Sequence, residues 1–174
     1  MKLPEKIESV FSSRVKPAHV SLPDELLKHV DSDVEDALWF SGRDWHELTW
    51  LDWQHHSSAI SFFDPDAFAY YLPSVLLLSA QHPNEWMNAA HSLVSQLDRS
   101  PDPLGWTEGF ASRFLGLNRA ELNVLKEWLL YICEYDPYRR YGPAGSGLGE
   151  TFGRAFDTLD LLEREVERRG AGSD

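Results

Sequence analysis

The chain has 174 residues, of which 43% are hydrophobic and 25% charged, a composition that is typical of one globular domain and excludes disordered and fibrous classes. Its net charge is −12 with histidine neutral, and general nucleic-acid binding is disfavoured because an acidic protein repels phosphate backbones. Cys133 is the single cysteine and cannot form an internal disulfide, which favours a reducing cytoplasm. The sequence has no signal peptide and no apolar run of about 20 residues that would span a membrane.

Apolar residues recur at helical spacing along nearly the whole chain, whereas the alternation typical of strands is almost absent. In the first third we expect helices over residues 3–11, from 21–25 onward, over 34–40 and over 50–54, and one short strand without an evident partner over 59–63. Asp33 is a candidate N-cap for the helix over 34–40, which Gly42 is expected to end, and Thr49 is a candidate N-cap for the helix over 50–54.

The strongest helix signal runs from Asp64, an N-cap candidate, to residue 81, with Pro65 at the first helical position. Apolar residues lie on every side of this segment, so we expect it to be covered all round at the centre of the core. Pro73 removes one backbone hydrogen bond in its interior and should kink the helix. The residues expected to be buried around the kink are Tyr71, Leu72 and Val75.

In the second half we expect helices over residues 85–97, 107–114, 122–133 and 152–166, with a glycine-rich loop over 138–149. Asn118 and Glu121 have the spacing of a capping box at the start of the third of these. The sequence therefore predicts one all-α domain over residues 1–170, an irregular bundle of about seven or eight helices around the kinked central helix. Residues 171–174 should form a frayed tail.

Two thirds of the net charge falls in residues 31–66, which carry one arginine, nine Asp or Glu residues and seven Trp or Phe residues. Aromatic side chains can anchor a protein partner, and carboxylates can steer a basic one. The partner-binding residues that this pattern predicts are Asp31, Glu35, Asp36, Asp44, Trp45, Glu47 and Trp50. A second interpretation stays open, in which the acids cap helices and the tryptophans fill the core.

The residues that could carry chemistry form no recognisable constellation. His55 and His56 follow Asp52, but the paired ligands of a metal site are missing. The Gly142–Gly149 loop lacks the lysine of a phosphate-binding loop. Cys133 falls on an apolar stripe, which favours a core residue over a reactive thiol. We therefore expect no catalytic residues, no cofactor, no metal and no enzymatic activity.

Three segments resemble a family of small, uncharacterised bacterial proteins. Gly42-Arg43-Asp44-Trp45 is similar to the family's G-x-x-W element, and the run SFFDPDAFAYYLPSVLL over residues 61–77 is similar to its F-x-P-E-A-F-x-Y-Y-L-P-A-F-L-L signature. Phe114 to Asn118 resembles the family's F-L-x-L-T-P-E-Q segment, and the resemblance covers about residues 33–132. Asp66 replaces a glutamate and Asn118-Arg119 replaces Thr-Pro, and both changes keep a helix-capping role. The resemblance implies a bacterial, cytoplasmic, helical protein, without an activity to transfer.

These observations predict a cytoplasmic, acidic protein-interaction module, for example an immunity-type protein that masks a basic toxin or effector. The alternative is a small-molecule- or metal-binding protein, with a pocket near Pro73 and the tyrosines or at His55 and His56. The sequence identifies neither the partner nor the oligomeric state.

Overall fold

The computed structural model describes residues 1–21, 32–135, 138 and 148–171, which hold nine α-helices, two short 3-10 helices and no β-strand. The α-helices are α1 Leu3–Phe11, α2 Ser32–Trp39, α3 Trp50–His55, α4 Ala59–Phe62, α5 Pro65–Gln81, α6 Asn88–Leu97, α7 Glu108–Phe114, α8 Arg119–Cys133 and α10 Leu148–Ala171. The 3-10 helices are η2 Trp45–Glu47 and η3 Pro103–Gly105. The all-α prediction is confirmed, while the expected helix start at residues 21–25 lies mostly outside the described residues.

Helix α5 forms the centre of the core. Asp64 caps it by accepting a hydrogen bond from the Ala67 N–H at 2.9 Å, and twelve of its seventeen residues are buried. The helix continues through Pro73, and the kink expected there stays a prediction. The expected burial of Tyr71, Leu72 and Val75 is confirmed.

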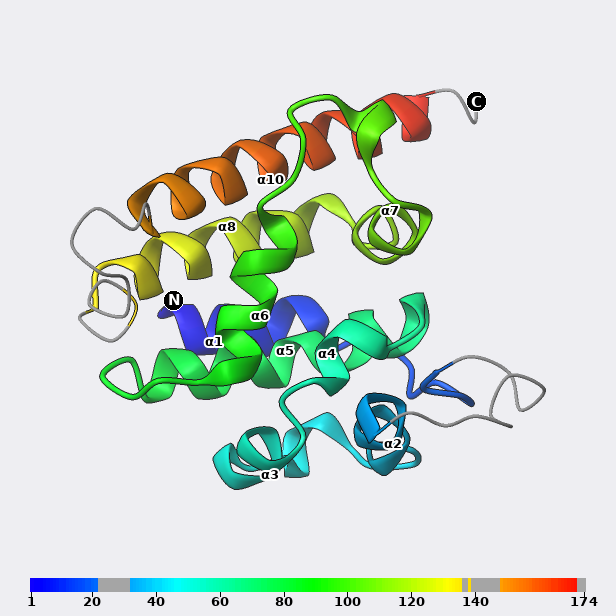
Figure 1. Ribbon diagram of the computed structural model, residues 1–174, viewed down its shortest axis with the longest axis vertical. Coiled ribbons are helices and arrows are strands. Elements are labelled where there is room, and N and C mark those ends of the chain that lie inside the picture. The colour runs from blue at the N-terminus through cyan, green and yellow to red at the C-terminus, as the bar shows by residue number, and fades with distance from the viewer. Residues whose placement is uncertain (22–31, 136–137, 139–147, 172–174) are drawn as a thin grey trace.

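The other helices lie around α5 in a defined order. Helix α1 packs against both α5 and α8, and α10 packs against α6 and α8. Figure 1 shows α8 and α10 side by side at one end of the long axis, and α2 and α3 at the opposite end. Helices α2 and α3, which belong to the acidic stretch of residues 31–66, are therefore separated from the C-terminal helix α10 by the core.

A buried ion pair ties the N-terminal segment to α8. Arg14 Nε donates to Glu121 Oε1 at 2.6 Å, although Glu121 is 0% exposed. Glu121 also accepts from the Asn118 N–H, and Asn118 accepts from the Glu121 N–H, which confirms the capping box. One carboxylate thus begins a helix and holds a distant segment against it.

Three elements differ from the sequence-based expectations. The strand expected over 59–63 is wrong, because Ala59–Phe62 forms α4, which packs against α2 and α6. A short apolar run fits a buried helix turn as well as a strand, so periodicity could not separate them. Helix α6 begins at Asn88 rather than 85, and α10 spans residues 148–171 rather than 152–166. Residues 172–174 of the expected tail lie outside the described residues.

Candidate functional site

The acidic and aromatic residues singled out in the sequence lie on α2, η2 and α3. Glu35 and Glu47 are exposed, and within the described part of the chain neither makes a side-chain hydrogen bond or ion pair. Asp36 and Asp44 are partly buried and engage neighbouring groups. Asp31 lies outside the described residues.

Asp36 holds α2 against the turn between α3 and α4. Its Oδ1 lies 3.0 Å from His56 Nδ1, and its Oδ2 accepts from the Ser58 hydroxyl at 2.7 Å. The Trp39 ring stacks on His56 with 4.4 Å between centroids, and the Arg43 guanidinium lies 3.6 Å from the Trp39 centroid. With both oxygens engaged inside the molecule, Asp36 has a structural contact that sequence reasoning did not foresee.

The charges of Asp44 and Glu47 both act on the buried hydroxyl of Tyr70. Asp44 caps η2 by accepting from the His46 N–H at 3.0 Å, and this bond and a second one to the His46 ring at 2.7 Å lower the pKa of the Asp44 carboxyl. Burial raises the pKa of Tyr70, and the charges of Asp44 and Glu47 raise it further. The two carboxylates, one at the N-cap of η2 and one at its last residue, therefore create one region of negative potential.

The two tryptophans of the predicted surface differ in burial. Trp45 is 2% exposed and belongs to the core, so its assignment to a partner-binding surface is wrong. Trp50 is half-buried, with its ring 5.3 Å from that of His82. Leu51 is 64% exposed and was missed, although a helix places it about 200° from the buried Trp53. That angle was the available signal for an outward-facing apolar residue.

The carboxylates of this region differ from the others in their counterions. Among the described side chains of residues 35–66, no Asp or Glu forms an ion pair with lysine or arginine, and the only ion-pair partners are His46 and His56. Several acids elsewhere pair with strong cations, as in Glu121 with Arg14, Asp98 with Arg154, and Glu163 with Lys126. The carboxylates of this segment outnumber its single arginine, so this end of the molecule carries an excess of negative charge, although the charge of Lys16 also acts on Asp44.

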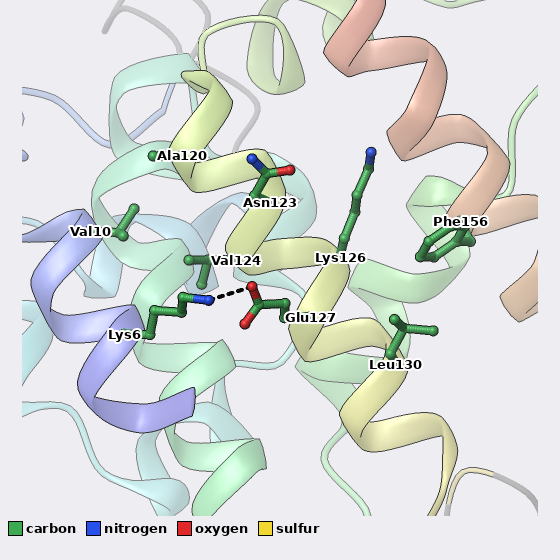
Figure 2. Close-up of a pocket in the computed structure, with 9 residues that line it drawn as sticks. All are labelled: Lys6, Val10, Ala120, Asn123, Val124, Lys126, Glu127, Leu130 and Phe156. Atoms are coloured by element: carbon green, nitrogen blue, oxygen red, sulfur yellow. Dashed lines mark hydrogen bonds and ion pairs between the residues drawn. The ribbon is translucent and has the colours of Figure 1, made fainter. Parts of the chain in front are cut away.

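A groove of about 440 Å³ lies at the other side of the core, between α1, α8 and α10 (Figure 2). The ion pair between Lys6 Nζ and Glu127 Oε1 joins α1 to α8 beside it. A second groove of about 360 Å³ shares Leu130 and Phe156 with the first, and Leu130 is 52% exposed. The two grooves are therefore continuous at Leu130 and Phe156, and the first of them also has the polar lining residues Lys6, Asn123, Lys126 and Glu127.

Cys133 lines the second groove, and it is only half-buried. It is the last residue of α8, and its partial exposure differs from the core position expected from the sequence. Its thiol donates to the Leu130 carbonyl oxygen at 3.1 Å.

The residues considered for a metal site do not converge. Asp52 caps α3 together with Thr49, His56 binds Asp36, and His55 is exposed. Across the described ranges no group of three or more His, Cys, Asp or Glu side chains could hold a metal ion. Over the same residues, no helix combines the length and apolar character needed to cross a membrane.

The sequence matches the family of unknown function DUF6714 over residues 1–142. This is consistent with the resemblance to an uncharacterised domain family, and it extends beyond residues 33–132; the detailed signature stays a prediction. Searches of curated proteins and of solved structures gave no match. Because the matched segment covers most of its length, the chain belongs to the family of unknown function DUF6714.

Proposed function

We propose that the chain is a cytoplasmic protein-interaction module that binds a basic protein through its acidic surface. The acidic surface comprises Glu35, Asp44, Glu47, Trp50 and Leu51. It retains four of the residues predicted from the sequence, omits the buried Trp45 and the internally bonded Asp36, and adds Leu51.

The observation that carries this proposal is the lack of strong counterions. In the described part of residues 35–66, seven carboxylates are present and none is paired with lysine or arginine. Uncompensated like charges repel one another, so a cationic partner gains electrostatic energy and is steered toward this end of the molecule.

Trp50 and Leu51 give the acidic surface its apolar contacts. Leu51 is the more exposed of the two, and both lie at the start of α3, which two residues separate from the end of η2. Protein interfaces gain most of their energy from a few apolar or aromatic anchors surrounded by polar groups. Glu47 and Asp44 supply such a polar surrounding from η2 and its N-cap.

An immunity-type role is the concrete form of this function that we favour. A toxin or effector with a cationic surface would be masked by a small acidic protein that binds it tightly. The small helical chain, the acidic surface and the absence of a recognisable catalytic constellation in the sequence support this form.

The test uses two double variants that change the net charge equally. Glu35→Lys with Glu47→Lys reverses two exposed, unpaired charges of the acidic surface. Glu134→Lys with Asp157→Lys makes the same change at exposed positions on the α8 and α10 layer. Wild type and both variants are immobilised, proteins retained from the host lysate are identified, and association rates are measured with the purified partner.

A basic protein retained by wild type and the control, but lost with the acidic-surface variant, is the expected result. At physiological salt the Debye length is about 8 Å, and it becomes shorter as salt is added. The rate at which this protein associates with wild type should therefore fall at higher salt concentrations, because the attraction between the charges is screened. Leu51→Ser should speed dissociation without changing the Tm, because the side chain is exposed in the free chain. Equal loss of the partner with both charge variants would show that only net charge matters and would contradict the proposal.

A second candidate function, small-molecule binding, is favoured by the paired grooves along α8. Their volumes of about 440 and 360 Å³ fall within the range of ligand sites, and Leu130 and Phe156 line both. A compound that raises the Tm of wild type but not of Leu130→Trp, which fills the grooves, would support this function. A compound that stabilises both proteins equally binds elsewhere.

A further inference from the structure

Two arginines pack on one cluster of aromatic rings, formed by Phe68, Phe110 and Phe114, where the end of α6 approaches α7. Arg99 follows the C-cap of α6, and its guanidinium lies 5.2 Å from the centroid of the Phe110 ring. Arg113 lies one turn after Phe110 on α7, and its guanidinium lies 5.6 Å from the centroid of the Phe68 ring. Burial lowers the pKa of Arg113, and the positive charge of Arg99 lowers it further.

Neither arginine has a carboxylate partner among the described residues. Arg113 donates only to carbonyl oxygens, to Ser61 at 2.6 Å, Gly109 at 3.0 Å and Ile60 at 3.4 Å. Asp98 is adjacent to Arg99 in sequence and attracts it, but both its oxygens are bound by Arg154 at 2.6 and 2.8 Å. Two adjacent cations without an anion between them are unusual in a chain whose net charge is −12.

Unsatisfied polar atoms mark the same place. Arg99 Nε is buried and has no hydrogen-bond partner, and neither has Oε1 of Gln96, a residue that is 8% exposed. Gln96 Nε2 reaches the Ser61 hydroxyl at 3.2 Å, which connects it to the residue whose carbonyl Arg113 binds. A buried donor such as Arg99 Nε costs free energy while it lacks a partner, and native proteins satisfy nearly all such donors. The Gln96 oxygen is an acceptor and needs a donor rather than an anion, so Arg99 Nε alone argues for an anion here.

We propose that Arg99 and Arg113 bind an oxyanion, the phosphate or carboxylate group of a ligand. A guanidinium group presents several N–H donors in a plane that matches such a group, and an oxyanion between the two cations would remove their repulsion. Arg99 Nε supplies a donor that has no other partner, while Arg113 is held in position by the last turn of α4. Arg99 and Arg113 are each only partly buried as whole residues.

The test titrates inorganic phosphate and acetate separately into the full chain at constant ionic strength and follows the Tm. When the concentration of the bound anion is ten times its Kd, the Tm of the wild-type chain should rise by roughly 3–5 °C. Arg99→Gln should weaken binding about 10-fold or more, because charge-assisted hydrogen bonds are lost. Arg164→Gln, which removes an exposed arginine from α10, serves as the matched control and should bind like wild type.

If the Tm rises with phosphate but not with acetate, the ligand group is a phosphate. If the Tm rises with acetate but not with phosphate, the ligand group is a carboxylate. Without either anion, Arg99→Gln should have the same Tm as wild type or a higher one, because it relieves the repulsion of Arg113. The Arg99 Nε–H resonance of wild type should shift with the same midpoint as the Tm titration, which reports binding without a variant. Absence of saturable binding by both anions, or equal binding by Arg99→Gln and wild type, would overturn the proposal.

Discussion

The indole N–H of Trp128 donates a hydrogen bond to the Ser79 hydroxyl oxygen at 2.8 Å, from a position 49 residues further along the chain. Ser79 in turn donates to the Val75 carbonyl oxygen of its own helix at 2.6 Å. Trp53 and Ser74 repeat the arrangement, with 2.9 Å between the indole nitrogen and the hydroxyl oxygen. The two serines that interrupt the apolar run of α5 therefore hold α8 and α3 against it.

The first prediction concerns Ser79→Ala. This change leaves the buried N–H of Trp128 without an acceptor, so the free energy of unfolding should fall by about 1–3 kcal/mol. Urea denaturation measures the loss, and Ser95→Ala, at an exposed position of α6, should change it by less than about 0.5 kcal/mol. If Trp128→Phe costs as much in the Ser79→Ala background as in wild type, the two side chains are not coupled.

The second prediction concerns the two ion pairs between the N-terminal segment and α8. Arg14→Met leaves the fully buried Glu121 without its cation and should cost about 3–5 kcal/mol. Lys6→Met breaks the exposed pair with Glu127 and should cost about 1 kcal/mol or less. Thermal and urea unfolding measure the free energy of unfolding of both variants. A similar loss in the two would contradict the conclusion that the first ion pair is buried and the second exposed.

The third prediction sets two glycines against each other. Gly42 has a φ of 75°, and Gly153 lies within α10, yet a Cβ would meet no atom within 4 Å at either position. Gly42→Ala should lower the free energy of unfolding by about 1–2 kcal/mol through backbone strain alone. Gly153→Ala should raise it by about 1 kcal/mol, because alanine favours the helix. Changes of the same sign would show that backbone conformation does not control these sites.

The fourth prediction concerns pH and His91, whose ring packs on Trp86 with 4.6 Å between centroids. Burial lowers the pKa of His91 below its ordinary value of 6.5. The unfolded chain then binds a proton on this residue more readily, so stability is lost as the pH falls below about 6.5 toward the folded-state pKa.

His91→Asn should therefore flatten the fall in the free energy of unfolding between about pH 7 and pH 5. An NMR titration of His91 in the folded chain should give a midpoint below 6.5. Parallel stability curves for wild type and the variant would contradict the assignment.

Local patterns predicted much of this fold, because helix starts depend on neighbouring residues. Thr49, Asp64 and Asn118 all cap the helices that they were expected to begin. The apolar periodicity also located α5 and its burial. The boundary of α6 was less predictable, since Trp86 and Met87 continue the apolar pattern without entering the helix.

Long-range partners could not be predicted from spacing. Nothing near Arg14 in the sequence points to Glu121, and nothing near Asp36 points to His56 and Ser58. For the same reason the sequence could not show that Trp45 is buried while Leu51 is exposed, or that Arg99 lies near Arg113. Such contacts depend on how separate helices pack, and one chain's periodicity does not encode the choice of neighbour.

The contact between Arg14 and Glu121 also sets an order of events during synthesis. The two residues are 107 positions apart, and a ribosome adds about 5–20 residues per second, so α1 is made roughly 5–20 s before its partner on α8. During that interval Ile7 and Phe11, which are fully buried in the finished fold, lack part of their cover. Until α8 has been made, the nascent α1 segment therefore presents apolar side chains that a ribosome-associated chaperone would bind.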